Sequence, residues 1–334
     1  MTDSITRARP HTQKPWDALA RRTGLVRFSG IYVMAVVVLL FWQVLRPGVW
    51  LSVNNMEVIL GQASVVGLLA IAAVLPMSAG LLDISFANVA GFSMGLTASL
   101  TLHTSVNPWL LALLSIGLSA LFGLVSGLLV AAFELPSLIV TLGMSSIALA
   151  VTQLVLDGAT LYPRDRLPGS FLALGADSWG FLPISAATLL VVALVAYVWI
   201  EHTPSGRRLL AVGGNPAAAR LAGVRGKRYQ VAVLTLSAAV SGLAGVVLLA
   251  TIGTADDVSS AAYLLPVFAA AFVGSTQVKA RFNVAGTILA VLLIQTGIHG
   301  IELTGLNQWV NHVFNGAVLV VAVVISRGSR KYAF

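Results

Sequence analysis

The sequence predicts an all-α integral membrane protein with about ten membrane-spanning helices. Composition, the length of the apolar runs and the placement of the basic residues all point to this class. Hydrophobic residues make up 57% of the 334 residues, charged residues only 10%, and the mean hydropathy is +0.91. A soluble domain carries roughly 25% charged residues, because its surface must face water. This composition therefore argues against a soluble fold.

Ten apolar runs are candidates for spans, since each helical crossing needs about 20 mostly apolar residues. The runs are 28–45, 56–77, 85–103, 109–133, 138–156, 181–200, 230–251, 261–273, 284–300 and 309–326. The run 261–273 is short and ends in a Gly-Ser-Thr break. The glycine pairs Gly91/Gly95 and Gly123/Gly127 have the spacing that lets helices approach closely in lipid, so we expect helix packing there.

The basic residues predict the orientation. With an even number of spans between the basic clusters, seventeen of the twenty Lys and Arg residues fall on one side. This is the positive-inside pattern, and it places both termini in the cytoplasm of a bacterial inner-membrane protein. The predicted domains are a basic cytoplasmic tail (1–27), a transmembrane domain (28–326) and a short cytoplasmic tail (327–334). The net charge of +8 then reflects topology, and we expect lipid rather than nucleic acid as a partner.

The most informative segment is the cytoplasmic loop 201–229. Asn215 is a strong helix N-cap, Pro216 suits the first helical position, and the alanines that follow favour helix. Arg220 suits the negative pole of the helix dipole and Gly223 is a typical terminator. We expect a two-turn helix, presented by a Gly213-Gly214 turn. A helix this short is unstable alone in water, so it must rest on its own bundle, on lipid or in a partner's groove. Because it lacks bulky anchors, a protein groove fits better than lipid.

The run 206–224, Gly-Arg-Arg-Leu-Leu-Ala-Val-Gly-Gly-Asn-Pro-Ala-Ala-Ala-Arg-Leu-Ala-Gly-Val, resembles a signature of the ribose-type ABC sugar permeases. The runs 80–85 (Gly-Leu-Leu-Asp-Ile-Ser) and 136–144 (Pro-Ser-Leu-Ile-Val-Thr-Leu-Gly-Met) resemble two further motifs of that family. The family's late cytoplasmic motif is kept only in part, at 274–276, Arg281 and 286–287, and Ala87 replaces a family glycine.

The resemblance implies a type II ABC-importer-like subunit whose loop docks on an ATPase. The residues assigned to this coupling are Gly206, Arg207, Gly213, Gly214, Asn215, Pro216, Ala218, Ala219, Arg220 and Gly223. It also implies a dimer with a second permease subunit, identical or not, two ATPase subunits and a periplasmic or extracellular solute-binding protein. The chain has no phosphate-loop motif, so we expect it to be no enzyme and to need no cofactor. ATP and Mg²⁺ would bind to the ATPase.

Span parity and the family analogy allow an inverted repeat, in which spans two to five and seven to ten form the two halves. Polar or aromatic side chains within the spans are candidates for the substrate pathway. They are Gln62, Ser64, Asn88, Thr141, Gln153, Phe268, Phe272, Gln295 and Asn315. For each, hydrogen bonding or packing between helices is the alternative, because a polar group in lipid must be paired.

Few ionisable residues lie at mid-membrane depth, which favours a neutral substrate and disfavours proton coupling. Asp83 and Glu134 are expected at cytoplasmic span ends within reach of solvent. The chain has no cysteine and its histidines lack metal-ligand spacing, so no metal site is expected. The predicted function is the import of a sugar or sugar-like neutral solute as the permease of an ABC importer. The alternatives are a gradient-driven secondary transporter and a membrane enzyme, for which no coupling carboxylate and no catalytic cluster stand out.

Overall fold

The computed structural model describes residues 36–277, 281–307 and 309–330 and has a helix at each predicted span. These helices are Val36–Leu45, α2 (Val53–Ser78), α3 (Phe86–His103), α4 (Pro108–Phe133), α5 (Ser137–Leu156), α7 (Ile184–His202), α10 (Gly226–Ile252), α11 (Leu264–Gln277), α12 (Val284–Leu303) and α13 (Trp309–Arg330). Within the described ranges, six of them are long and apolar enough to cross a membrane: α2, α4, α5, α7, α10 and α12. The all-α membrane class is confirmed, whereas the exact number of ten spans stays a prediction. The predicted tail 1–27 lies outside the described residues.

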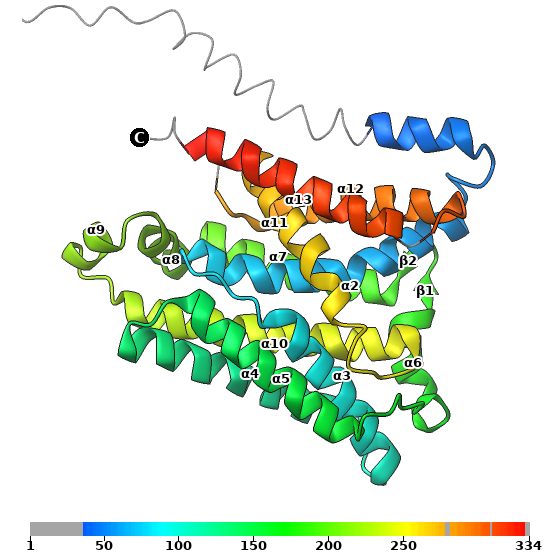
Figure 1. Cartoon of the computed structure of the whole chain (residues 1–334), viewed down its shortest axis with the longest axis horizontal. Helices are drawn as coiled ribbons and strands as arrows, with labels where there is room; N and C mark the ends of the chain where they lie inside the picture. Colours follow the sequence, from blue (N-terminus) through cyan, green and yellow to red (C-terminus); the bar gives the residue numbers. More distant parts are fainter. Residues whose placement is uncertain (1–35, 278–280, 308, 331–334) are drawn as a thin grey trace, which may run out of the picture.

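Shorter elements cover the two ends of the bundle. At one end lie η1 (Arg164–Arg166), α6 (Gly169–Ala176) and the antiparallel pair β1 (Ser178–Trp179) and β2 (Leu182–Pro183). At the other end α8 (Pro204–Gly214) and α9 (Pro216–Leu221) extend from the bundle, at the left of Figure 1. We call these the hairpin end and the α9 end. A 3-10 turn, η2 (Ala261–Tyr263), precedes α11.

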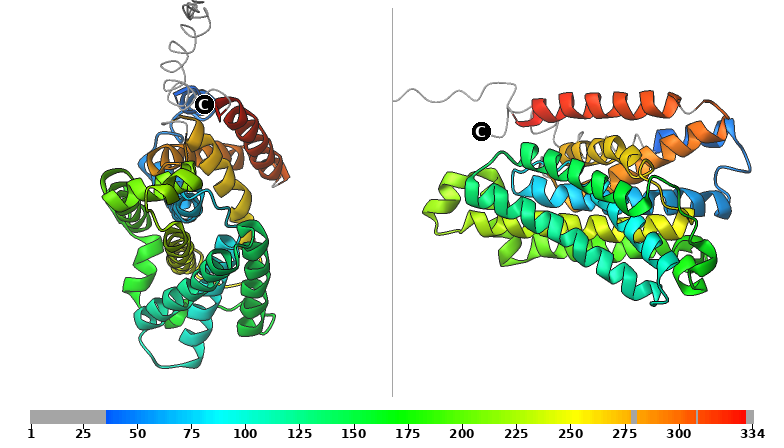
Figure 2. Two further views of the ribbon diagram at one scale, coloured as in Figure 1. Left: turned by 90° about the vertical axis from the view of Figure 1, so that its left-hand side faces the viewer. Right: turned by 60° about the horizontal axis from the view of Figure 1, so that its bottom comes forward.

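The helix α2 forms the centre of the core, as the views in Figure 2 show. It packs against α10, α12, α7 and α11, and 78% of its most apolar stretch is buried. By contrast, only 33% of the corresponding stretch is buried in α4 and in α5, and 28% in α7. These three helices present leucines to the outside, such as Leu113, Leu154 and Leu194. An apolar outer surface of this kind is what lipid contact requires.

The packing follows an inverted repeat. α2 ends, and α10 begins, beside α8: Gly80 lies next to Gly213, and Gly226 next to Val212. The first helices of the two halves are therefore antiparallel. Within each half, the second helix packs on the third and the fourth: α3 packs on α4 and α5, and α11 packs on α12 and α13. Between the halves, the first helix of one packs on the third helix of the other: α10 packs on α4, and α2 packs on α12. This scheme agrees with the pairing of spans two to five with spans seven to ten.

Glycines allow the close contacts between helices. A Cβ on Gly123 would meet the backbone carbonyl oxygen of Leu234, and a Cβ on Gly127 would lie 2.7 Å from the Cα of Val231. Both glycines are on α4 and both partners are on α10. The predicted packing role of the Gly123/Gly127 pair is therefore confirmed.

The start of α2, at the hairpin end, is tied to α12 by side chains. The Oδ1 of Asn55 and the Nε2 of the buried His299 are 2.7 Å apart, and the Nδ2 of Asn55 donates to the carbonyl oxygen of Trp50 at 2.9 Å. These contacts hold the hairpin end of α2 in place, while its other end meets α8.

Candidate coupling surface at the α9 end

The helix α9 has the expected caps. The side-chain Oδ1 of Asn215 accepts a hydrogen bond from the backbone N–H of Ala218 at 3.0 Å, and Pro216 is the first helical residue. Gly223 has φ +78°, a left-handed conformation that glycine adopts without a steric penalty. Ala219 is buried, whereas 89% of Leu221 is exposed. The predicted short helix is thus confirmed, and it presents an apolar side chain to the outside.

The helix α8 was missed by the sequence analysis, and the expected Gly213-Gly214 turn was wrong. Both glycines are the last residues of α8. Leu209 and Val212 are buried on its inner face, and this packing outweighs the low helix propensity of glycine. A signal was present: Thr203 accepts from the N–H of Gly206 at 3.0 Å and precedes a proline, the same cap pattern as Asn215-Pro216.

Backbone contacts fix α8 on the bundle. A Cβ on Gly213 would meet the carbonyl oxygen of Ser78, and one on Gly206 would meet the carbonyl oxygen of Trp199. The indole Nε1 of Trp199 also donates to the Oγ of Ser205 at 2.8 Å. The end of α2 and the corner between α7 and α8 therefore hold this helix without room for added side chains.

An exposed ion pair connects the start of α10 with the end of α4. The Nζ of Lys227 lies 2.8 Å from a carboxylate oxygen of Glu134. The hydrogen bond and the charge of Lys227 lower the pKa of Glu134 below its usual range, with a smaller contribution from Arg220. Beside this pair lies an open cleft of about 540 Å³. Its lining includes Gly80, Leu81, Leu82, Leu135, Ser137, Leu138, Val212, Pro216, Arg220 and Gln230.

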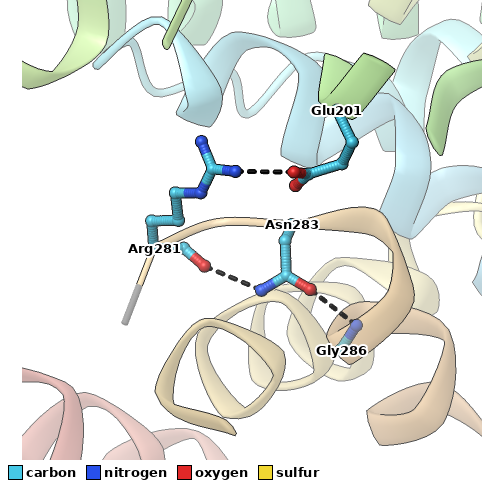
Figure 3. A network of polar contacts seen from close by, with 4 residues as sticks. All are labelled: Glu201, Arg281, Asn283 and Gly286. Atoms are coloured by element: carbon cyan, nitrogen blue, oxygen red, sulfur yellow. Dashed lines mark hydrogen bonds and ion pairs between the residues drawn. The ribbon is translucent and has the colours of Figure 1, made fainter. Parts of the chain in front are cut away.

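A second ion pair connects the end of α7 with the turn between α11 and α12 (Figure 3). The Nη2 of Arg281 lies 2.7 Å from the Oε2 of Glu201, whose side chain is only 8% exposed. Asn283 caps α12: its Oδ1 accepts from the N–H of Gly286 at 2.7 Å, and its Nδ2 donates to the carbonyl oxygen of Arg281 at 2.8 Å.

The ten residues assigned to coupling form one continuous surface on α8 and α9. Gly206 and Ala219 are buried and Gly213 is half-buried, so these three support the surface. The exposed members are Arg207, Gly214, Asn215, Pro216, Ala218, Arg220 and Gly223. Backbone contacts attach α8 to the end of α2 and to the end of α7.

Four of the predicted pathway residues make polar contacts between elements. The Nδ2 of Asn88 donates to the Oγ of Ser145 at 2.9 Å, joining α3 to α5. Thr141 accepts from the N–H of Ile84 at 3.2 Å. Gln62 donates to Glu302 at 3.4 Å, and the exposed Gln153 donates to Asp257 at 2.8 Å. Gln153 is therefore paired with a distant side chain although it is exposed.

The other pathway residues lie within the packed bundle. Ser64 donates to the carbonyl oxygen of Leu60 in its own helix. Phe268 has ring contacts with Phe86 and Phe272. Gln295 and Asn315 are buried, and in the described part of the chain their side-chain carbonyl oxygens have no hydrogen-bond partner. Phe268 and Phe272 contact each other, and each hydrogen bond given above joins one candidate to a residue outside this set. The role of the nine residues in a pathway stays a prediction.

The expectation for Asp83 was wrong, because only 2% of this residue is exposed. Its Oδ1 accepts from the N–H and the Oγ of Ser85 at 2.8 and 2.6 Å, and its Oδ2 accepts from the Oγ of Ser237 at 2.8 Å. Burial raises the pKa of Asp83, although these hydrogen bonds act in the opposite direction. Ser237 lies 154 residues away on α10, a proximity that no local pattern signals. Glu134 is exposed, as expected.

The apolar helices, the inverted packing and the capped helix pair define a multi-pass membrane permease. The chain matches the family model described as "Branched-chain amino acid transport system / permease component" over residues 55–323 and belongs to that family.

Curated relatives match over most of their length. The ribose import permease of Bacillus subtilis is 28% identical over 90% of this chain and 91% of its own. The fructose import permease of Rhizobium meliloti is 28% identical over 90% of this chain and 85% of its own. A probable ABC transporter permease of Escherichia coli is 31% identical over 88% of both chains. The resemblance to sugar ABC permeases is therefore confirmed.

Proposed function

We propose that the chain is the membrane-spanning subunit of an ATP-driven importer, with the α9 end in the cytoplasm. The observation that carries this proposal is the capped helix α9, which projects from the bundle with Leu221 exposed on it. Most of the described basic residues lie at the same end, including Arg207, Arg208 and Lys227. By the positive-inside rule this end faces the cytoplasm, where ATP is available, and both termini lie there as well.

In this function α9 inserts into a groove of an ATPase subunit, which binds ATP and Mg²⁺. The permease itself needs no cofactor. A second permease subunit would complete the pathway across the membrane, and a soluble binding protein would deliver the solute at the hairpin end. The names of the relatives as ABC and import permeases support this assembly.

The transported solute is a sugar or a similar neutral molecule. The ribose and fructose import permeases among the relatives support a sugar. The family description instead mentions branched-chain amino acids, so leucine belongs in any test as the competing cargo. The buried polar groups of the bundle are mostly hydroxyls and amides, which suit an uncharged solute.

The test is reconstitution of the permease with candidate ATPase and binding-protein subunits from the same organism. Proteoliposomes would be supplied with labelled ribose, fructose, arabinose or leucine. ATP-dependent uptake of one of the sugars is the expected result. Uptake by the permease alone, driven by an ion gradient, would instead support a secondary transporter.

A matched pair of variants tests the role of α9. Ala218→Glu places a charge on its exposed face and should abolish co-purification of the ATPase. Ala159→Glu makes the same change at an exposed position of the hairpin end and should leave co-purification unchanged. Equal binding of the ATPase by both variants would contradict the assignment.

A further inference from the structure

The ion pair between Glu201 and Arg281 joins two parts of the chain that are 80 residues apart. Glu201 lies in the last turn of α7, directly before the coupling surface, and Arg281 precedes α12. The side chains are 8% and 33% exposed, so the pair is largely shielded from solvent. Shielding from water strengthens the attraction between two charges.

Hydrogen bonds and backbone contacts hold the described segments on each side of this pair. On the Arg281 side, the Nδ2 of Asn283 donates to the carbonyl oxygen of Arg281 at 2.8 Å and to that of Gly274, in α11, at 3.3 Å. A Cβ on Gly274 would lie 2.5 Å from the backbone N of Thr287, so α11 and α12 are in backbone contact. On the other side, Thr203 caps α8 and donates to the carbonyl oxygen of Trp199 at 2.6 Å. These contacts connect α8, through the ion pair, with the start of α12.

The first half of the bundle has a comparable tie at the opposite end. There the Nη1 of Arg166, in η1, donates to the carbonyl oxygen of Leu102 at 2.9 Å. Leu102 is at the end of α3, just before the turn that leads to α4. The turns α3–α4 and α11–α12 occupy equivalent places in the inverted repeat. In the described residues an arginine contacts each of these turns, and the arginine of the α11–α12 turn binds Glu201, directly before the coupling surface.

We propose that the Glu201–Arg281 pair is a positioning element that links the α8–α9 coupling surface to the α11–α12 half of the bundle, so that movement of α9 is accompanied by movement of α12. This inference rests on the proposed function, since it assigns the force to a bound ATPase. Neither residue touches ATP or solute. Without the pair, ATP hydrolysis would continue while less of the motion reached α11 and α12.

The transport test compares solute uptake with ATP hydrolysis in the reconstituted assembly, with the labelled sugar that the wild-type protein imports. Glu201→Gln and Arg281→Gln should each lower uptake per ATP by about fivefold. The double variant Glu201→Arg/Arg281→Glu restores the attraction and should recover most of the loss. Asp177→Asn, which removes an exposed charge at the hairpin end and outside the coupling loop, is the control and should leave the ratio unchanged.

A distance measurement tests the link without any partner or solute. The natural chain has no cysteine, so Arg208→Cys on α8 and Ala285→Cys on α12, both at exposed positions, give two unique labelling sites. Spin labels at these sites in the full chain in nanodiscs should show a narrow distance distribution. Glu201→Gln or Arg281→Gln should broaden it, and the charge exchange should narrow it again.

The two readouts separate the two ideas. If wild-type protein imports none of the labelled sugars, the proposed function fails, while the spin-label distances still test the link. The link is overturned if single substitutions leave the distance distribution unchanged. A second outcome also overturns it. In that outcome the single substitutions lower uptake per ATP, but the double charge-exchange variant does not recover the uptake even though its melting temperature equals that of the wild-type protein.

Discussion

Gly213, near the end of α8, lies with its backbone directly against the carbonyl oxygen of Ser78, in the last turn of α2. A side chain at position 213 has no space, because the atoms that it would meet belong to the backbone. Through this contact the coupling surface rests on the most buried helix of the bundle. The neighbouring Gly214 differs, since nothing lies within 4 Å of a Cβ built there.

Gly213→Ala should therefore separate α8 from α2 and lower ATP-driven uptake by about fivefold. Gly117→Ala, in α4, is the matched control, because it adds the same methyl group in open space outside the coupling surface. Uptake into proteoliposomes at equal protein content measures both. If the two variants transported equally well, the contact with Ser78 would have no part in coupling.

Asn215→Ala should weaken binding of the ATPase. The substitution removes the hydrogen bond to the N–H of Ala218, and loss of an N-cap costs about 1 kcal/mol of helix stability. Because α9 has only six residues, the bound conformation would be populated less often, and the Kd should rise about fivefold. Asn215→Asp keeps an accepting oxygen and should bind nearly as well as wild type. Titration of the ATPase onto immobilised permease gives the Kd values.

Asp83→Asn should raise the melting temperature at pH 7.5. Burial raises the pKa of Asp83, so the folded protein keeps this proton at a pH where the unfolded chain has released it. The stability of the wild-type protein therefore falls as the pH rises from the unfolded pKa toward the folded one. Asparagine cannot lose a proton, and Ser237 can turn its hydroxyl to accept from the amide. We expect a gain of roughly 3 °C at pH 7.5 that shrinks toward pH 4.

Glu134→Gln serves as the contrast for that experiment. The pKa of Glu134 is lowered by Lys227, so its contribution is present above the unfolded pKa and is lost as the pH falls through the folded value. This variant should not gain stability at pH 7.5. A fall in melting temperature for Asp83→Asn at that pH would show that the buried carboxylate is favourable as an anion.

Gly123→Val should destabilise the bundle by about 1–3 kcal/mol, because the added side chain collides with the backbone of α10 at Leu234. Gly117→Val, on the same helix, adds the same atoms where nothing lies within 4 Å. Thermal unfolding in detergent, followed by tryptophan fluorescence, compares the two. Similar melting temperatures would rule out a tight α4–α10 contact at Gly123.

Local pattern was sufficient to predict a helix at each described apolar run and the capped helix α9. Apolar runs locate helices because the bilayer requires them, and Asn215-Pro216 is a start signal that acts within one turn. The same reasoning applied to Thr203-Pro204 would have found α8. Its two terminal glycines suggested a turn instead, since propensity says nothing about the burial of Leu209 and Val212.

Contacts between distant segments could not be predicted in this way. The burial of Asp83 depends on Ser237 of α10, and the environment of Glu201 depends on Arg281. Which face of a helix a polar residue occupies is set by how neighbouring helices cross, and the pattern within one span does not contain that information. For the same reason the pattern names nine polar and aromatic candidates but does not say which of them face a common pathway.

The central helix α2 also has a mechanical consequence. It is one continuous helix of 26 residues, about 39 Å long. One end bears on α8 through Ser78, and the other is clamped to α12 through Asn55 and His299. A displacement of α8 would therefore be transmitted along α2 to its contact with α12 at the hairpin end. ATPase docking and solute entry, although at opposite ends of the bundle, would then both depend on the position of this one helix.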